Sequence, residues 1–424
     1  MVKLLWTTEG GKTGEDALEF ASDPEELETE LLPYDILTNI AHSIMLKEQG
    51  YMEKDELEEV LENLSQLYKK SPEVEAEDVH TFVEEYVTER SEAGKKIHTG
   101  RSRNDQVVTD TRLMLKDSCI KISEKALELV GSLEKFTEEE NVLMPGYTHQ
   151  RMAMPSSTGL WASSYIDMIL DDLKSLKGTY LTINSSPLGA AAGYGTSLNI
   201  NRERTAELLG FSEVQENPVY CVNRGKHELM VLQNLDQFMV DIGKLCEDLI
   251  TFSMEEKPFF KIPEEFCTGS SIMPQKSNPD VLEIARAKTG KFSGKVQALR
   301  NIVSKLPHGY NRDTQETKKL LLSSIGELME VLDVLTELVK RLKAVEQDVD
   351  DSIFAAYTAN KMVESGTPFR DAYRKVKESQ EYEIPEGEPP SPEFQDYSGI
   401  EEFWSSESES FSRMKKQLLN FQHN

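Results

Sequence analysis

Residues 269–279 form an eleven-residue stretch in which small, polar and cationic side chains precede a helix-like segment. Unpaired backbone amides at a helix start, together with the Lys276 ammonium, can bind a carboxylate and stabilise negative charge that develops on it. Ser270 can act as a base there if a cation and a helix N-terminus stabilise its alkoxide. Asn278 is expected to cap the helix, with Pro279 in its first turn. The alternative is a plain Gly/Ser/Pro loop before a capped helix.

Residues 98–106, HTGRSRNDQ, place two arginines and an amide beside another expected helix start. Arg101, Arg103 and Asn104 are suited to holding a dicarboxylate through charge-assisted hydrogen bonds, because the arginine fork matches the geometry of a carboxylate. The alternative is a polar turn in which Ser102 or Asn104 caps the helix.

Thr148 and His149 end a third stretch, residues 145–149. Histidine suits proton transfer to a leaving group, since its pKa lies near neutrality and can be tuned by a carboxylate such as Glu283. A lone histidine in a helical protein is, however, more often a structural or solvent-exposed residue. A fourth stretch, residues 310–318, by itself indicates a charged loop between helices.

The first stretch resembles the signature loop of the fumarase/aspartase superfamily of lyases. That resemblance implies that Ser270 is the catalytic base and that Lys276 and Asn278 bind the substrate. It also implies that Glu283 pairs with a histidine from another region. Residues 98–110 resemble the argininosuccinate lyase branch of the superfamily, rather than the fumarase, aspartase or adenylosuccinate lyase branches.

Further site residues follow from the same resemblance, which spans roughly residues 34–373. It implies that Arg103 and Asn104 contact the substrate and that Arg101 and Ser102 shape the same substrate-binding loop. Thr148 and His149 would bind substrate and help to protonate the leaving group. The fourth stretch adds three substrate contacts, Tyr310, Gln315 and Lys318, and weaker similarity covers His80 and residues 187–193 and 366–370.

The sequence also departs from the family pattern. Leu31 stands where a serine usually precedes Tyr34, Gln150 and Arg151 replace a Leu-Gln pair, and residues 221–226 differ from a Ser-Asp-Arg-Asp pattern; the N-terminal Trp-Gly-Gly-Arg-Phe run is absent. Our hypothesis is that Arg151 supplies a substrate contact that other members obtain elsewhere, through a charge-assisted bond to a carboxylate. The alternative is that Arg151 pairs within a subunit interface.

The resemblance implies a carbon–nitrogen lyase that reversibly eliminates fumarate from argininosuccinate, releasing arginine, without metal or organic cofactor. It implies a role in arginine biosynthesis and a homotetramer in which three subunits build each active site. One rival is another fumarate-forming lyase, acting on adenylosuccinate or aspartate, against which residues 98–106 argue. A second is a non-catalytic, crystallin-like protein, against which the joint presence of Ser270, His149, Lys276 and Glu283 argues.

Five long segments with helical periodicity must position these residues. We predict an all-α fold, with a long central helical bundle and smaller helical N- and C-terminal domains, and no strand pattern of any length. Apolar stripes along five long helices indicate oligomerisation, because one chain cannot readily cover them. The predicted domains are 1–98, 99–349 and 350–424; the five long helices are 113–143, 156–183, 226–256, 279–306 and 316–349; shorter helices are expected at 55–70 and 411–421.

Composition excludes several classes of partner. The chain has 47 Lys and Arg against 75 Asp and Glu, and its net charge of −28 disfavours binding to nucleic acid and to anionic membranes. Its four cysteines form no Cys-x-x-Cys pair, which argues against a zinc site or a disulfide scaffold and fits a reducing compartment. The apolar stretch near the N-terminus is too short for a signal peptide, and no later run is long enough to span a bilayer, so we expect a cytoplasmic location.

Overall fold

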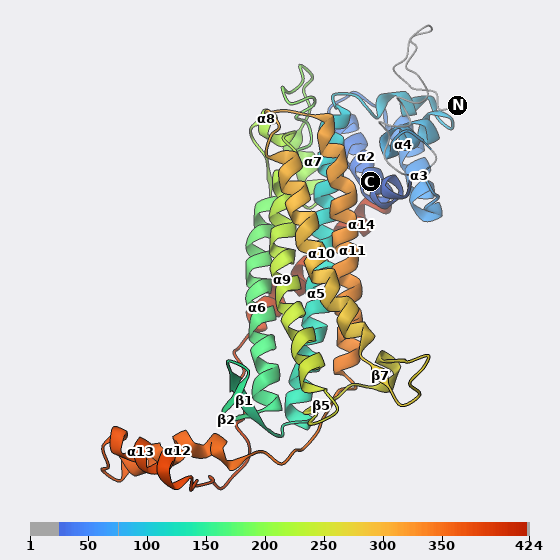
Figure 1. The fold of residues 1–424 in the computed structure, drawn as a ribbon. Helices are drawn as coiled ribbons and strands as arrows, with labels where there is room; N and C mark the ends of the chain where they lie inside the picture. The colour runs from blue at the N-terminus through green and yellow to red at the C-terminus, as the bar shows by residue number, and fades with distance from the viewer. Residues whose placement is uncertain (1–24, 75, 422–424) are drawn as a thin grey trace.

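Five long helices lie side by side and form the central bundle of the computed structural model, which describes residues 25–74 and 76–421 (Figure 1). The apolar stripe of the third is buried along its whole length, as its spacing predicts; it comprises Leu232, Leu235, Phe238, Ile242, Leu245 and Leu249. The mostly helical fold with a long central bundle is confirmed. The five helices are α5 (Arg103–Glu139), α6 (Thr158–Ile183), α9 (Lys226–Phe252), α10 (Asp280–Val303) and α11 (Glu316–Val339).

Helix α5 begins ten residues before the predicted start at residue 113. Its first turn is fixed by a capping box: the Ser102 hydroxyl accepts from the Asn104 amide, and the Asp105 carboxylate accepts from the Ser102 amide. The early turns escaped the prediction because most of their buried residues, among them Asp105 and Asp110, are polar and give no apolar period.

The other long helices match their predictions to within a few residues at most ends. Helix α11 is shorter, ending at Val339, because the chain then forms β8 (Lys343–Ala344), which pairs with β5 (Phe260–Lys261). The predicted cap of α10 was wrong. Pro279 is the N-cap and no side chain caps the helix, since Asn278 is engaged in a strand pair with Thr268.

Further helices, most of them short, gather at the end of the bundle where α5 begins, and α2 packs against α5 itself (Figure 1). The leucines predicted to line one face of residues 55–70 are buried in α3. The absence of a signal peptide is a prediction about residues outside the described part of the chain. These helices are α2 (Glu25–Glu48), α3 (Lys54–Lys70), α4 (Val79–Thr88), the 3-10 helix η1 (Glu92–Lys96), α7 (Arg202–Leu208) and α8 (Pro218–Cys221).

The prediction that the chain has no strands was wrong. β1 (Leu143–Thr148) and β2 (Arg151–Ser157) form an antiparallel hairpin at the other end of the bundle. The sequence pattern of this hairpin did not indicate strands, because Pro145 and Pro155 face each other in it and proline is rare inside strands. Three further pairs have two residues per strand: β3 (Ser185–Ser186) with β4 (Glu213–Val214), β5 with β8, and β6 (Thr268–Gly269) with β7 (Ser277–Asn278).

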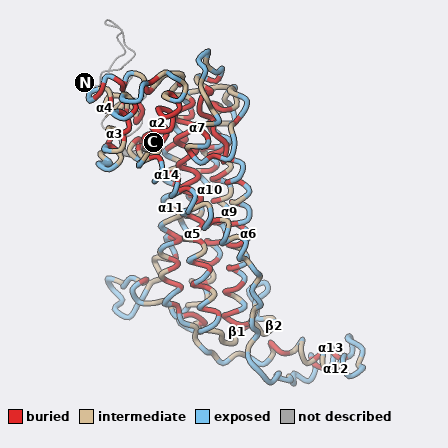
Figure 2. Tube along the Cα trace, turned by 180° about the vertical axis from the view of Figure 1, so that it is seen from behind, coloured by how far each residue is buried: buried red, intermediate tan, exposed pale blue. Residues whose placement is uncertain are grey.

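After the bundle, α12 (Ala355–Glu364) and α13 (Phe369–Ser379) project away from it, and the chain then returns (Figure 1). The predicted short helix at 411–421 is part of a longer one, α14 (Ser398–Leu419), which packs against α5 and α2. Its apolar face is buried along the bundle (Figure 2). The division into domains 1–98, 99–349 and 350–424 stays a prediction. No helix of the described residues is long and apolar enough to cross a membrane.

Candidate active site

A cavity of about 220 Å³ lies at the end of the bundle where α5 and α11 begin. Five residues predicted to bind substrate lie together in its wall: Arg103, Asn104, Tyr310, Gln315 and Lys318. The N-terminal turn of α5 supplies two of them, and the segment leading into α11 supplies the others. The remaining lining residues are Glu28, Glu77, Asp78, His80, Val107, Arg224 and Arg312.

Arg103 is held from the side of α4. Its guanidinium donates to Asp78 Oδ2 at 3.0 Å and to Thr81 Oγ1 at 2.8 Å. Burial alone would raise the pKa of Asp78, but His80 and Arg103 outweigh it and hold the pKa below its ordinary value. Asp78 also caps α4 by accepting from the Thr81 amide. A helix start and an ionised carboxylate thus fix the orientation of the guanidinium.

Lys318 forms a buried ion pair with Glu28, at 2.5 Å between Nζ and Oε1. The other carboxylate oxygen of Glu28 accepts from the Val79 amide at 2.9 Å. Burial would raise the pKa of Glu28, but the attraction of Lys318 lowers it overall, so the pair is ionic. Sequence reasoning missed Glu28, because one glutamate in a Glu-rich stretch carries no distinguishing signal.

His80, covered only by weak similarity, belongs to a buried network beside the cavity. Its Nδ1 lies 2.7 Å from Asp35 Oδ1, which also accepts from the Gln106 amide nitrogen at 2.6 Å. Burial and the charge of Asp35 hold the pKa of Asp110 well above its ordinary value, which favours its neutral form. Ligand atoms of Asp35, His80 and Asp110 lie within 4.8 Å of one another, close enough for a metal ion. The hydrogen bonds instead make Asp35 the group that orients the His80 ring.

Arg101 and Ser102 do not line the cavity. The Arg101 guanidinium is buried and donates to Asn39 Oδ1 and to the Ile97 carbonyl. Ser102 caps α5. Both residues therefore hold the loop that presents Arg103 and Asn104, as the resemblance implies for the shaping of that loop.

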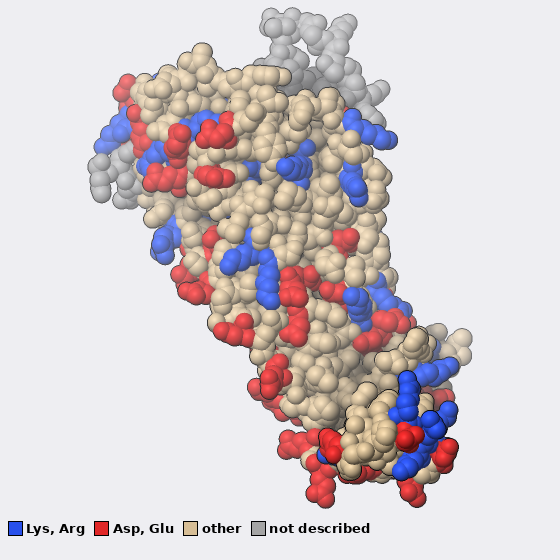
Figure 3. Space-filling model, turned by 90° about the vertical axis from the view of Figure 1, so that its left-hand side faces the viewer, with Lys and Arg blue, Asp and Glu red and all other residues tan. Residues whose placement is uncertain are grey.

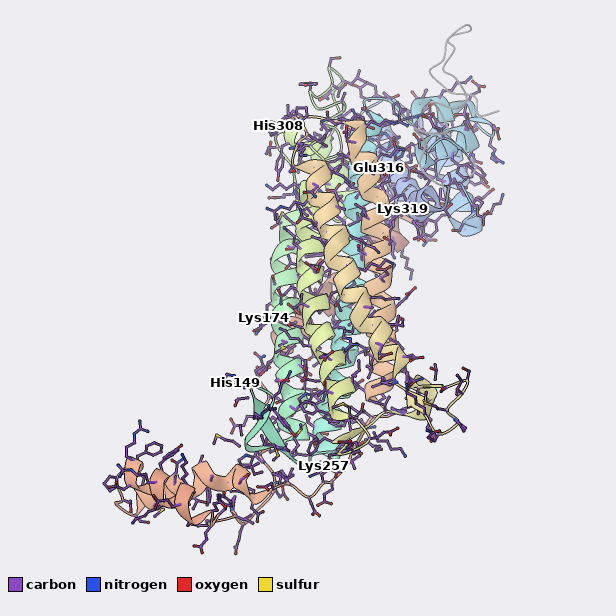
Figure 4. All side chains as sticks on the ribbon, in the orientation of Figure 1. His149, Lys174, Lys257, His308, Glu316 and Lys319 are labelled. Atoms are coloured by element: carbon purple, nitrogen blue, oxygen red, sulfur yellow. The ribbon has the colours of Figure 1, made fainter. Side chains whose placement is uncertain are left out.

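Thr148, His149 and Arg151 lie in the β1–β2 hairpin, at the end of the bundle opposite the cavity; His149 is labelled there in Figure 4, while His308 and Glu316 mark the cavity end. His149 and Gln150 form the two-residue turn, and both have left-handed backbones with φ of 54° and 57°. Thr148 pairs across the hairpin with Arg151, whose guanidinium donates to the Gln150 carbonyl at 3.2 Å. These exposed side chains do not contact the cavity.

The loop that holds Ser270 projects from the bundle between β6 and β7, also toward the end opposite the cavity (Figure 1). The Ser270 hydroxyl oxygen accepts from the amides of Ile272 at 3.3 Å and Met273 at 3.1 Å. Thr268 is hydrogen-bonded to Asp280 at the base of the loop. Lys276, Asn278 and Glu283 lie in or just after the same loop.

The candidate residues therefore fall into three groups in one chain. The first lines the cavity and contains Arg103, Asn104, Tyr310, Gln315 and Lys318. The second lies in the hairpin (Thr148, His149 and Arg151) and the third in or after the Ser270 loop (Ser270, Lys276, Asn278 and Glu283), both away from the cavity. No hydrogen bond joins Glu283 to His149 among the described residues, and both are exposed. Catalytic groups of a single site must lie within a few ångströms of the substrate. A site built from all three groups needs more than one copy of the chain.

Comparison with known proteins identifies the family. A family model described as Lyase matches residues 42–294. The chain is 40% identical to an argininosuccinate lyase of Thermotoga neapolitana, over 89% of this chain and 98% of that one. It is 41% identical to an argininosuccinate lyase of Bacteroides fragilis, over 83% of this chain and 81% of that one.

Solved structures share the fold. An EDDS lyase in complex with formate aligns with a TM-score of 0.77 at 21% identity, covering 95% of this chain and 92% of that one. A class II fumarase from Schistosoma mansoni aligns with a TM-score of 0.69 at 17% identity, covering 86% and 91%. Since the sequence relatives match nearly the full chain, the chain belongs to the argininosuccinate lyase family and is a carbon–nitrogen lyase.

Proposed function

We propose that the chain catalyses the reversible elimination of argininosuccinate to arginine and fumarate, as part of arginine biosynthesis in the cytoplasm and without metal or organic cofactor. One observation carries the proposal: the cavity gathers Arg103, Asn104, Tyr310, Gln315 and Lys318 at two helix starts. Cations and amide groups at helix N-termini suit a substrate with several carboxylates.

Ser270 acts as the base in this proposal. It removes a proton from the carbon next to a substrate carboxylate, and the resulting carbanion spreads its charge into that carboxylate. The bond between carbon and the guanidinium nitrogen then breaks, which releases arginine and leaves fumarate. Lys276, Asn278 and the amides of the loop stabilise the doubly charged intermediate. The two amides that already donate to the Ser270 oxygen support this role, because they favour the alkoxide.

His149 assists the departing nitrogen, with Thr148 binding the substrate beside it and Glu283 pairing with the imidazole. An exposed position at the hairpin tip suits a histidine that completes a site on a partner subunit. Arg151 lies across the hairpin from Thr148, so its guanidinium is placed to bind a carboxylate in the same neighbourhood.

The active form is a homotetramer in which three subunits build each site. Its support is the placement of the three groups: if rod-shaped bundles pack antiparallel, the hairpin and the Ser270 loop of two subunits reach the cavity end of a third (Figure 1). Exposed apolar side chains on the bundle helices would be covered in such an assembly. They include Leu160 and Leu181 on α6, Val240 on α9 and Ile284 on α10.

The test is to offer the purified protein argininosuccinate, adenylosuccinate and aspartate separately and to follow fumarate by its ultraviolet absorbance. Fumarate should appear from argininosuccinate alone. Release from adenylosuccinate or aspartate instead would assign the chain to a different reaction. No release from any of the three would leave a structural protein of this fold.

A further inference from the structure

Two side chains in the wall of the cavity, Arg224 and Glu77, carry buried polar atoms that have no hydrogen-bond partner among the residues that the structure describes. They are Nε and Nη2 of Arg224 and Oε2 of Glu77. A buried polar or charged group without a partner destabilises the fold, so such groups are rare and call for a reason. Their opposite charges and shared cavity suggest a ligand that carries both signs.

Arg224 is only 7% exposed, and its position is fixed by the backbone beside it. Gly225 follows with a φ of 96° and is the N-cap of α9. A Cβ at Gly225 would lie 2.2 Å from Val303 Cγ1, so only glycine fits there. Arg224 lines both the site cavity and a neighbouring cavity of about 350 Å³.

The Glu77 side chain is 7% exposed, and its Oε2 lies 4.0 Å from Arg103 Nη1, too far for a hydrogen bond. Burial and the neighbouring Asp78 raise the pKa of Glu77. The other acids of the cavity are already engaged, since Glu28 pairs with Lys318 and Asp78 pairs with Arg103. Glu77 is therefore the acid of this cavity whose buried oxygen makes only a long ion-pair contact, with Arg103, and no hydrogen bond among the described residues.

We propose that Arg224 and Glu77 form the receptor for the α-amino-acid end of the arginine half of the substrate. Arg224 binds the α-carboxylate and Glu77 binds the α-ammonium. The inference rests on the proposed function. The fumarate half has only carboxylates and gives Glu77 nothing to bind, whereas an α-amino acid satisfies both groups at once. Charge-assisted recognition of this kind makes the site reject analogues that lack either group.

Calorimetric titration tests this without requiring turnover, with arginine, agmatine and 5-guanidinopentanoate as ligands of the oligomer. Agmatine lacks the carboxylate and 5-guanidinopentanoate lacks the amino group. We expect the wild-type protein to prefer arginine over each by roughly tenfold to a hundredfold. Arg224→Gln should abolish only the preference for arginine over agmatine. Glu77→Gln should abolish only the preference for arginine over 5-guanidinopentanoate. The preference of Arg224→Lys for arginine over agmatine should lie between those of wild type and Arg224→Gln, because lysine keeps the positive charge without the forked guanidinium.

Lys226→Gln is the matched control, because Lys226 lines only the neighbouring cavity and its removal should leave both preferences intact. Thermal melts establish that each variant is folded. In the synthetic direction, Arg224→Gln and Glu77→Gln should each raise KM for arginine and leave KM for fumarate within about twofold of wild type. Equal rises for both substrates, or unchanged preferences in both Gln variants, would overturn the assignment. A wild-type protein that binds arginine selectively but releases no fumarate would contradict the proposed function and leave this receptor standing.

Discussion

In the proposed mechanism Ser270, a common side chain, takes the uncommon role of a base. Two backbone amides donate to its oxygen, and such donors favour the deprotonated form. We expect Ser270→Ala to lower kcat by several orders of magnitude with KM little changed, because a base acts in the transition state. Ser271→Ala, in the same loop, should retain turnover. Steady-state kinetics measures both, and turnover of Ser270→Ala within tenfold of wild type would rule out its role as base.

The turn of the hairpin is strained at Gln150, whose φ of 57° is left-handed. Side chains with a Cβ avoid this region at a cost of about 1 kcal/mol, whereas glycine adopts it freely. Gln150→Gly should therefore raise the free energy of unfolding by about 1 kcal/mol in chemical denaturation. Met152→Gly, inside β2, should have the opposite sign because glycine weakens a strand. A less stable Gln150→Gly protein would show that the turn is not strained.

At the residue scale, residue types alone suggested a dicarboxylate site for residues 98–106 but only a charged loop for residues 310–318. Gln315 and Lys318 were named through resemblance to known lyases. Both line one cavity with Arg103, and their roles in binding substrate stay a prediction. Glu28 and Glu77 could not be predicted. Each is one acid among 75, and its importance arises only from the buried cations around it.

Among the elements, helices were predictable where burial follows an apolar period, as in α9 with its stripe of leucines. The prediction failed where tertiary contacts replace that period. The first turns of α5 bury polar residues, α11 stops where a strand pair begins, and the β1–β2 hairpin contains two prolines. The extent of α14 was underestimated because its charged residues dilute the apolar positions before Phe411.

The contact of α6 with α9 contains an acid with a displaced pKa. Burial, with Asp241 and Asp171 adding repulsion, raises the pKa of Asp172 to about 7, and its Oδ2 has no hydrogen-bond partner. The folded state thus holds this proton to higher pH than the unfolded state, where the pKa is about 3.9. Its contribution to stability is complete below pH ~4 and is lost as the pH rises through about 7.

Asp172→Asn should remove this loss. Relative to wild type, the variant should gain about 2 kcal/mol in the free energy of unfolding between pH 5 and 8. Denaturation at a series of pH values measures the difference. Asp167→Asn is the control, since Asp167 is exposed on the same helix and is not among the groups that shift the pKa of Asp172. A difference between Asp172→Asn and wild type that does not vary with pH would contradict the raised pKa.

For the whole molecule, the separation of the three groups predicts complementation between inactive variants. Ser270→Ala changes the loop between β6 and β7, and Gln315→Ala changes the cavity where α11 begins, at the opposite end of the bundle (Figure 1). If different subunits supply them, unfolding and refolding a one-to-one mixture should restore activity at about a quarter of the sites, the product of two halves. Each variant refolded alone should stay inactive. A mixture no more active than its components would mean that one chain completes the site.

Charges of both signs are interspersed along the face seen in Figure 3, so the large negative net charge is not gathered into one patch there. Over the described residues, many charged side chains form pairs within or between neighbouring helices, such as Lys288 with Glu330 and Arg286 with Glu247. Exposed pairs of this kind contribute little to stability individually. The bundle therefore depends on its buried apolar stripes.

The return of α14 to the bundle has a consequence for synthesis on the ribosome. Trp404 is fully buried, and α14 packs against α2, an element translated more than 300 residues earlier. While the ribosome makes the intervening chain, the surface that α14 will cover on α2 and α5 stays open to water and to other nascent chains. The amino-terminal helices therefore complete their packing only after translation, and this exposed surface is a natural binding place for a chaperone.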